Sequence, residues 1–165
     1  MKWPILAIKP PKNRKTYAMP VAWTLASIFL IFVLVHLIRI DKLIPVVAET
    51  LGTTGATWFV SLIVIMEVFA LPFLLRLRLS PLFRIMSGLF VVLVPLIWTC
   101  FTIWAINNGH STGQFSSYVS TPSSWWLIIL DLLWLVISYW TLWLLNYERA
   151  FKDLKNTSKK HAKSV

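Results

Sequence analysis

The sequence predicts an all-α integral membrane protein, a four-helix bundle with both termini in the cytoplasm. Of its 165 residues, 58% are hydrophobic and 15% are aromatic, which is more apolar surface than a soluble domain of this size can bury. Four apolar windows approach the ~20 residues that a bilayer core of about 30 Å requires of a helix. These windows are residues 21–38, 57–75, 85–106 and 125–145.

Basic residues indicate which side of the membrane each connection faces. Five Lys and Arg lie in the arm at residues 1–19, three lie between the second and third windows, and six lie in the tail at residues 147–165. The other two connections hold only Arg39 and Lys42. Because cytoplasmic loops are enriched in Lys and Arg, both termini are predicted on the cytoplasmic side of a bacterial inner membrane. Residues 20–146 then form one transmembrane domain. We attribute the net charge of +10 to this cytoplasmic face, and we expect no nucleic-acid partner.

Local signals support each helix in turn. Pro20 suits the first turn of the first helix, and the apolar run that follows is too long for a cleaved signal peptide. Residues 42–51 are expected to form a short helix on the outer surface. Ser80-Pro81 starts the third helix after a tight inner turn, which makes the second and third spans antiparallel neighbours. Residues 107–124 are polar and uncharged, and they are predicted to form an outer loop.

Small and polar side chains recur at helical spacing and predict the inward face of each helix. Pro72 also removes the helical donor for the carbonyl of Val68, so a hydroxyl or a neighbouring helix is expected to compensate. Cys100, the single cysteine, is read as a small packing residue. The predicted inward stripes are Ala22, Ala26, Phe29, Val33 and His36; Val60, Val64, Glu67 and Leu71; Gly88, Pro95, Thr99 and Thr102; and Ser124, Asp131, Ser138 and Thr141.

Ionisable residues within the spans are costly in lipid, so they are expected to face the interior and to be partnered. At 1.5 Å per residue, Asp131 lies roughly 9 Å and Glu67 roughly 13 Å below the outer boundary. Arg39 can reach inward to Asp131, and His36 can reach either acid. We therefore predict one polar cluster of His36, Arg39, Glu67 and Asp131 in the outer half of the bundle. It either locks the packing or forms a proton- or ligand-responsive site open to the outside.

Several kinds of chemistry find no motif in the sequence. It contains no HExxH, P-loop, GxGxxG or Gly-x-Ser-x-Gly pattern, and bis-His haem ligation within one chain would need a second intramembrane histidine besides His36. We expect no catalytic residue, no metal site and no cofactor, with quinone kept open as an alternative. Whether the protein is an enzyme is left open, and the sequence favours a protein without enzyme activity.

The second and third spans resemble the DoxX-like superfamily of four-helix bacterial membrane proteins, which includes the MauE type. The similarity rests on Met66-Glu67, on the arginine-bearing turn at residues 75–84, and on the long third span. It continues through residues 107–109, 113–115 and 122–125, where MauE-type proteins carry loop cysteines that are absent here. The resemblance covers about 90 residues and implies a four-helix fold, with association with periplasmic redox proteins or quinone-linked oxidoreductases in relatives.

These observations lead to one expected function and two alternatives. The expected function is a non-catalytic accessory or subunit of an envelope or redox-linked complex, with the lipid bilayer and a membrane or periplasmic protein as partners. One alternative is a small proton- or cation-linked transporter that uses Glu67 and Asp131. The other is a quinone-reactive oxidoreductase subunit, with Trp side chains and His36 lining a quinone slot. The oligomeric state is left open.

Overall fold

The computed structural model of the protein describes residues 10, 12–110 and 125–149. Of the predicted outer loop, the stretch 111–124 lies outside the described residues. Most of the predicted basic arm and the tail beyond Arg149 also lie outside them.

Four helices make up the described structure, and each covers nearly all of one predicted span. They are α1 (Ala18–Ile38), α2 (Ile40–Leu74), α3 (Pro81–Asn107) and α4 (Trp125–Leu144). All four are long and apolar enough to cross a bilayer. The predicted all-α four-helix bundle is confirmed, and the chain is an integral membrane protein. The side of the membrane on which the termini lie stays a prediction.

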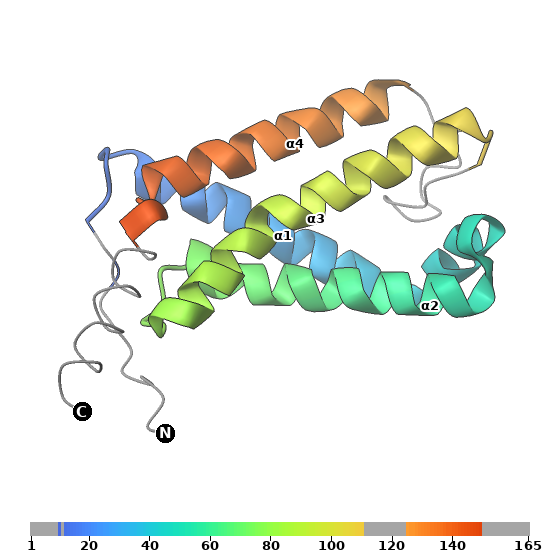
Figure 1. Cartoon of the computed structure of the whole chain (residues 1–165), viewed down its shortest axis with the longest axis horizontal. Coiled ribbons are helices and arrows are strands. Elements are labelled where there is room, and N and C mark those ends of the chain that lie inside the picture. The colour runs from blue at the N-terminus through green and yellow to red at the C-terminus, as the bar shows by residue number, and fades with distance from the viewer. Residues whose placement is uncertain (1–9, 11, 111–124, 150–165) are drawn as a thin grey trace, which may run out of the picture.

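The second helix is longer than the predicted second span because it begins at Ile40, directly after α1. Gly52 interrupts α2 with φ 72° and ψ 163°, a conformation that glycine tolerates because it has no Cβ. The segment before Gly52 is thus a short helix of its own, as expected for residues 42–51. Figure 1 shows this segment folded over at one end of the bundle.

Three helices end in the same hydrogen-bonded turn, a Schellman motif in which a residue with positive φ follows the last turn. That residue is Arg76 after α2, Gly109 after α3 and Asn146 after α4. In each case the next backbone N–H donates to the carbonyl five residues earlier, at 2.9–3.1 Å. The orphan carbonyls at these helix ends are thereby partly satisfied within the chain itself.

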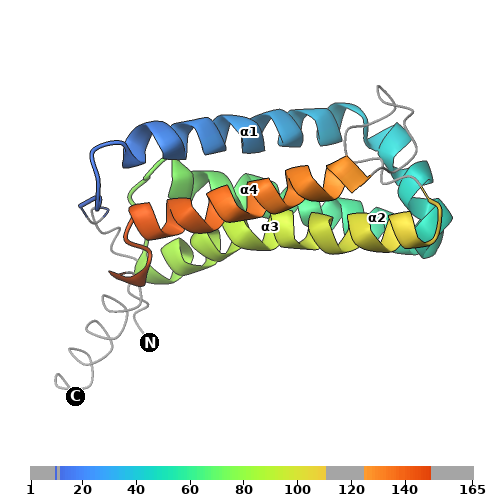
Figure 2. The same ribbon diagram turned by 90° about the horizontal axis from the view of Figure 1, so that it is seen from above.

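The helices run antiparallel in chain order, and the bundle closes where α4 returns to α1. Helices that follow one another pack closely, whereas the seam between α1 and α4 is sparser (Figures 1 and 2). The start of α1, the turn at residues 75–80 and the end of α4 lie together at what we call the termini end. The α1–α2 junction, the end of α3 and the start of α4 form the far end.

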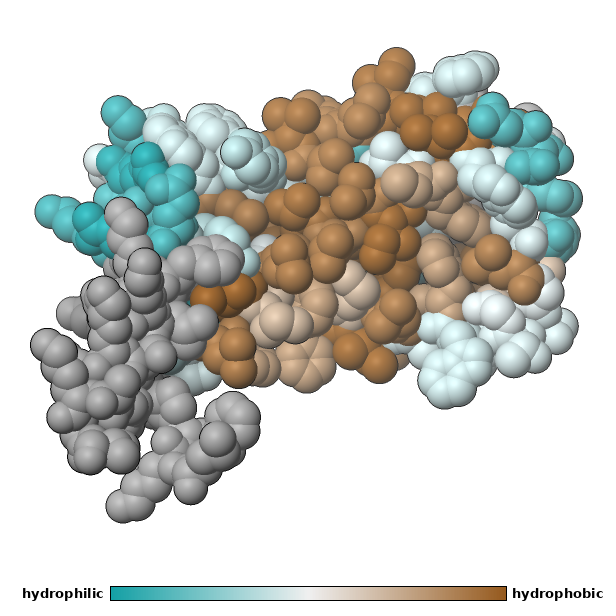
Figure 3. All heavy atoms as spheres, viewed as in Figure 1, coloured by the Kyte–Doolittle hydropathy of each residue, from teal (hydrophilic) through white to brown (hydrophobic). Residues whose placement is uncertain are grey.

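Side-chain burial separates an interior from a lipid-facing surface. Every predicted inward residue that the structure describes is buried or half-buried, and Trp98 and Phe29 are among the largest buried side chains. Large apolar side chains also cover the outside, as a continuous brown belt between hydrophilic ends shows (Figure 3). The prediction that Cys100 is a packing residue is wrong, because Cys100 lies on the exposed face of α3 and not in the packed interior.

The helical ladder near Pro72 is repaired by a side chain from the neighbouring helix. The Ser87 hydroxyl donates to the Phe69 carbonyl at 2.6 Å and accepts from the Phe73 N–H at 3.0 Å. This hydroxyl bonds the carbonyl one residue beyond Val68, so the predicted compensation of the Val68 carbonyl itself stays a prediction. Because Ser87 belongs to α3, this repair also joins α3 to α2.

Candidate intramembrane polar site

The first element of the candidate site is a buried acid–base contact between α1 and α2. His36 lies in the last turn of α1, and its Nδ1 is 3.0 Å from Oε2 of Glu67. His36 is 1% exposed and Glu67 is 0% exposed, so neither side chain meets lipid. Of the two acids within its predicted reach, His36 therefore contacts Glu67.

Aromatic rings from two helices enclose His36. The ring centroid of Phe32, one turn earlier on α1, lies 5.6 Å from that of His36, and Trp98 of α3 lies 5.5 Å from it. Trp98 in turn meets the edge of Phe59 from α2. Such rings exclude water and lower the local dielectric, which strengthens the contact between His36 and Glu67. The sequence pattern did not indicate that Trp98 neighbours His36.

The second element joins α3 to α4. Thr102 donates its hydroxyl proton to Oδ2 of Asp131 at 2.7 Å, and both side chains are buried. Thr102 is five residues from the end of α3, and Asp131 is six residues from the start of α4. In antiparallel neighbours these positions have nearly the same depth. Shared depth is therefore the signal in the sequence that permits this pair, although depth alone does not select it.

The structure brings the predicted site residues together only in part. His36 and Glu67 touch, and Asp131 contacts Thr102, which the predicted cluster did not include. Arg39 forms the junction between α1 and α2, three residues after His36, and is half-buried. The predicted single cluster of four, with Arg39 reaching Asp131, stays a prediction.

Four buried polar atoms in this region have no hydrogen-bond partner within the described residues. One is Oε1 of Glu67, the carboxylate oxygen that faces away from His36. The others are the indole nitrogens of Trp98 and Trp134 and the hydroxyl of Ser138. Unpaired polar groups at this depth are energetically unfavourable. They mark positions where a proton, a water molecule or a ligand would be stabilised.

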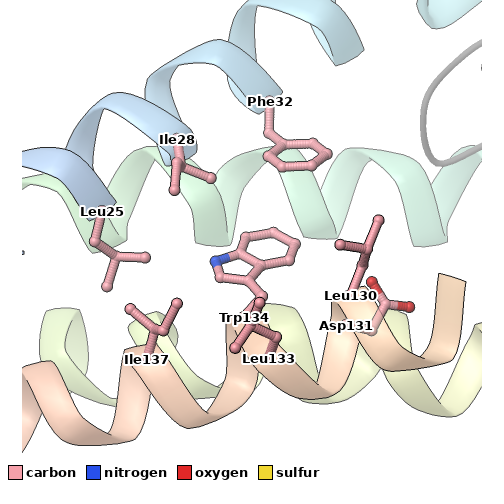
Figure 4. Close-up of a pocket in the computed structure, with 8 residues that line it drawn as sticks. All are labelled: Leu25, Ile28, Phe32, Leu130, Asp131, Leu133, Trp134 and Ile137. Atoms are coloured by element: carbon pink, nitrogen blue, oxygen red, sulfur yellow. The ribbon is translucent and has the colours of Figure 1, made fainter. Parts of the chain in front are cut away.

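A groove of about 240 Å³ lies along the sparse seam between α1 and α4. Its lining is apolar apart from Asp131 and the indole of Trp134 (Figure 4). Trp134 stacks against Phe32 with ring centroids 4.8 Å apart and an interplanar angle of 9°. Figure 4 shows the indole nitrogen directed toward the Leu25 end of the groove, with Asp131 at the opposite end. The groove therefore has an apolar lining, and the Trp134 nitrogen beside it is itself buried and has no hydrogen-bond partner among the described residues.

Comparisons with known proteins assign no family to this arrangement. No known protein family, curated protein or solved structure matches the chain. Within the described ranges, no three His, Cys, Asp or Glu side chains are grouped so that they could hold a metal ion.

Proposed function

We propose that the protein is a non-catalytic accessory or subunit of an envelope or redox-linked complex, of DoxX-like type. It resides in a bacterial inner membrane with both termini in the cytoplasm. The strongest support is that the buried polar contacts join neighbouring helices. His36 with Glu67 joins α1 to α2, Ser87 joins α2 to α3, and Thr102 with Asp131 joins α3 to α4. Contacts that each link one helix pair favour a rigid bundle that offers its surface to a partner.

Affinity purification of the tagged protein from native membranes tests this proposal. We expect a defined membrane or periplasmic protein to co-purify at a fixed ratio. Glu67→Gln, which keeps the size of the side chain, should retain that partner, because the carboxylate serves packing in this proposal. Recovery of the pure chain alone, together with a transport or redox activity that Glu67→Gln abolishes, would refute it.

A second candidate is a proton- or cation-linked transporter in which Glu67 and Asp131 carry the charge. It is favoured by Oε1 of Glu67, which is buried and has no hydrogen-bond partner within the described residues. A carboxylate that can change its protonation state beside a histidine is a common element of proton pathways. Proteoliposomes with an internal pH dye provide the test: Glu67→Gln should abolish proton movement, whereas Glu49→Gln, at an exposed acid on the same helix, should not.

The third candidate is a quinone-reactive subunit that binds the quinone in the groove between α1 and α4. Trp134 lies nine residues into α4, about 13 Å deep, where the ester carbonyls of bilayer lipids do not reach. A quinone partitions to this depth of the bilayer, and its carbonyl oxygen would accept a hydrogen bond from the indole N–H. Solvent extraction of purified protein should recover quinone. Trp134→Phe should reduce the yield, whereas the exposed Trp125→Phe should not.

A further inference from the structure

A short segment before α1, residues 12–15, is bound to the end of α4, and we call it the strap. The backbone N–H of Arg14 donates to the Leu144 carbonyl at 3.1 Å. Its Nε–H donates to Oδ1 of Asn146 at 2.9 Å, and Nδ2 of Asn146 donates to the Lys12 carbonyl at 2.8 Å. Figure 2 shows the segment, in dark blue, passing from the start of α1 toward the end of α4. The two side-chain bonds join residues 132 and 134 positions apart in the sequence.

The guanidinium group of Arg14 makes two further contacts at the same place. It lies 4.8 Å from the ring centroid of Trp143, and its Nη2 is 3.3 Å from Oε2 of Glu148. The contact with the indole is a favourable cation–π interaction, whereas the pair with the exposed Glu148 adds little. Asn146 is also the residue with positive φ that follows α4. The turn that ends α4 therefore carries the amide that binds the strap.

The strap joins the two neighbouring helices that pack least closely. α1 and α4 are not consecutive in the chain, so no connecting turn holds them together, and their seam is sparse. Rings contact each other across it, with Phe32 stacked on Trp134 and the Tyr17 centroid 6.1 Å from that of Trp140. The groove of about 240 Å³ lies along the same seam. Few packing contacts make this seam the least costly one to open.

The strap is short enough to restrain α1. Arg14 lies four residues before Ala18, where α1 begins, and four fully extended residues span at most about 14 Å. While Arg14 is bound to Leu144 and Asn146, the start of α1 cannot move farther than this from the end of α4. Release of the strap removes this limit and leaves the seam to its ring contacts.

We propose that the strap holds the α1–α4 seam closed, and that its release lets α1 move away from α4 and opens the groove to the bilayer. The seam is then a lateral gate. Its opening would uncover the Trp134 indole nitrogen, which is buried and has no hydrogen-bond partner among the described residues. The strap would act in this way under any of the three functions considered above, because none of them gives a role to Arg14 or Asn146.

Spin-label distances in the full chain, in phosphatidylcholine nanodiscs, measure the opening of the seam. The exposed Cys100 is first replaced in a Cys100→Ser background. Labels on Thr24→Cys of α1 and Val136→Cys of α4, both at exposed positions, report on the α1–α4 seam. Labels on Ile65→Cys of α2 and Leu89→Cys of α3, also exposed, report on the α2–α3 pair as a control. Hydrogen exchange of the backbone amide at position 14 shows separately whether the strap is bound.

The variant that releases the strap is Arg14→Gln/Asn146→Gly. Glycine keeps the positive φ at position 146 without the amide. Exchange at position 14 should become at least about tenfold faster. The α1–α4 distance should lengthen by at least about 4 Å, one carbon–carbon contact distance, while the α2–α3 distance stays unchanged. Asn146→Gly alone should give a smaller opening in the same sense. Lys15→Gln, the same charge change at an exposed neighbour, should leave the seam closed.

Four results would overturn the proposal. Fast exchange at position 14 with an unchanged α1–α4 distance would mean that the strap does not hold the seam. Slow exchange in the double variant would mean that these side chains do not hold the strap. An equal lengthening of the α2–α3 distance would mean that the whole bundle has loosened. If Lys15→Gln opens the seam as far as the double variant does, the loss of positive charge and not the strap is the cause.

Discussion

At the scale of single residues, the His36–Glu67 contact is the central feature of the bundle interior. The sequence predicted that both residues face inward, because an acid in lipid needs a partner. It left His36 within reach of both Glu67 and Asp131, since depth along a helix does not determine the direction of a side chain. Rotation of α1 against α2 resolves this ambiguity and places Nδ1 of His36 3.0 Å from Glu67.

A double-mutant cycle measures the coupling free energy between His36 and Glu67. His36→Leu and Glu67→Leu should each lower the free energy of unfolding by about 1–3 kcal/mol, because each leaves a buried polar partner unsatisfied. The double variant should recover at least about 0.6 kcal/mol of the summed loss, the usual size of a polar coupling between membrane helices. Unfolding in mixed detergent micelles, followed by tryptophan fluorescence, gives these values.

The control for this cycle is Glu49→Leu, at an exposed acid in the first part of α2. It should change the stability little and should show no coupling to His36→Leu. Strict additivity of the His36 and Glu67 changes would contradict the contact.

At the scale of helices, hydroxyl and ring contacts decide how α2, α3 and the end of α4 fit together. Ser87 fills the gap in the α2 ladder near Pro72. Gly88, the next residue, leaves the space that the ring of Tyr147 occupies. A Cβ on Gly88 would overlap this ring. Two adjacent small residues of α3 therefore fix its contacts with both neighbours.

Ser87→Ala tests the first of these contacts. Loss of the hydroxyl leaves the Phe69 carbonyl and the Phe73 N–H without their bridge, so we expect a loss of about 1–3 kcal/mol. Ser27→Ala is the matched control, because the Ser27 hydroxyl is exposed and bonds only the Trp23 carbonyl of its own helix. Its effect should stay within about 0.5 kcal/mol. Equal effects of the two changes in the same unfolding assay would show that the bridge adds nothing.

Gly88→Ala tests the second contact. The new methyl group would displace the Tyr147 ring and break the bond from its hydroxyl to the Ile85 carbonyl, now 2.7 Å long. We expect a loss of about 1–3 kcal/mol, as is usual for overpacking. In a Tyr147→Leu background the same change should cost much less, because the smaller side chain leaves room. An undiminished cost in that background would place the clash elsewhere.

At the scale of the whole molecule, the distribution of charge along the chain and the bundle architecture agree. The start of α1, the arginine-bearing turn and the end of α4 meet at one end. The described basic residues next to these helix ends, among them Arg14, Arg76 and Arg149, therefore belong to one end of the bundle. The side of the bilayer that this end faces stays a prediction. The grouping of these helix ends results from the antiparallel order of all four helices and not from one loop.

Reporter fusions measure the predicted orientation. A fusion after Lys155 should give a fluorescent cytoplasmic reporter and an inactive alkaline phosphatase, because both termini are predicted inside. A fusion at Gly113 should give the opposite pair of signals. If both positions report the same compartment, the orientation and the even number of crossings are wrong.

The sequence by itself determined the four helices, their approximate bounds and their inward faces. Length and hydrophobicity determine which segments span a bilayer, and helical periodicity determines which side chains share a face. The short helix predicted at residues 42–51 also followed from the local sequence, whereas the hydroxyl near Pro72 bonds Phe69 and Phe73 and not the predicted Val68 carbonyl.

Only the tertiary structure decided which inward residues meet. His36 contacts Glu67, Asp131 contacts Thr102, and Trp134 stands beside the groove because of the rotation and spacing of whole helices. These quantities result from the packing of all four helices at once, and local sequence patterns do not contain them. Cys100 shows the same limit: its chemistry suited a packed interior, but the rotation of α3 leaves it on the exposed face.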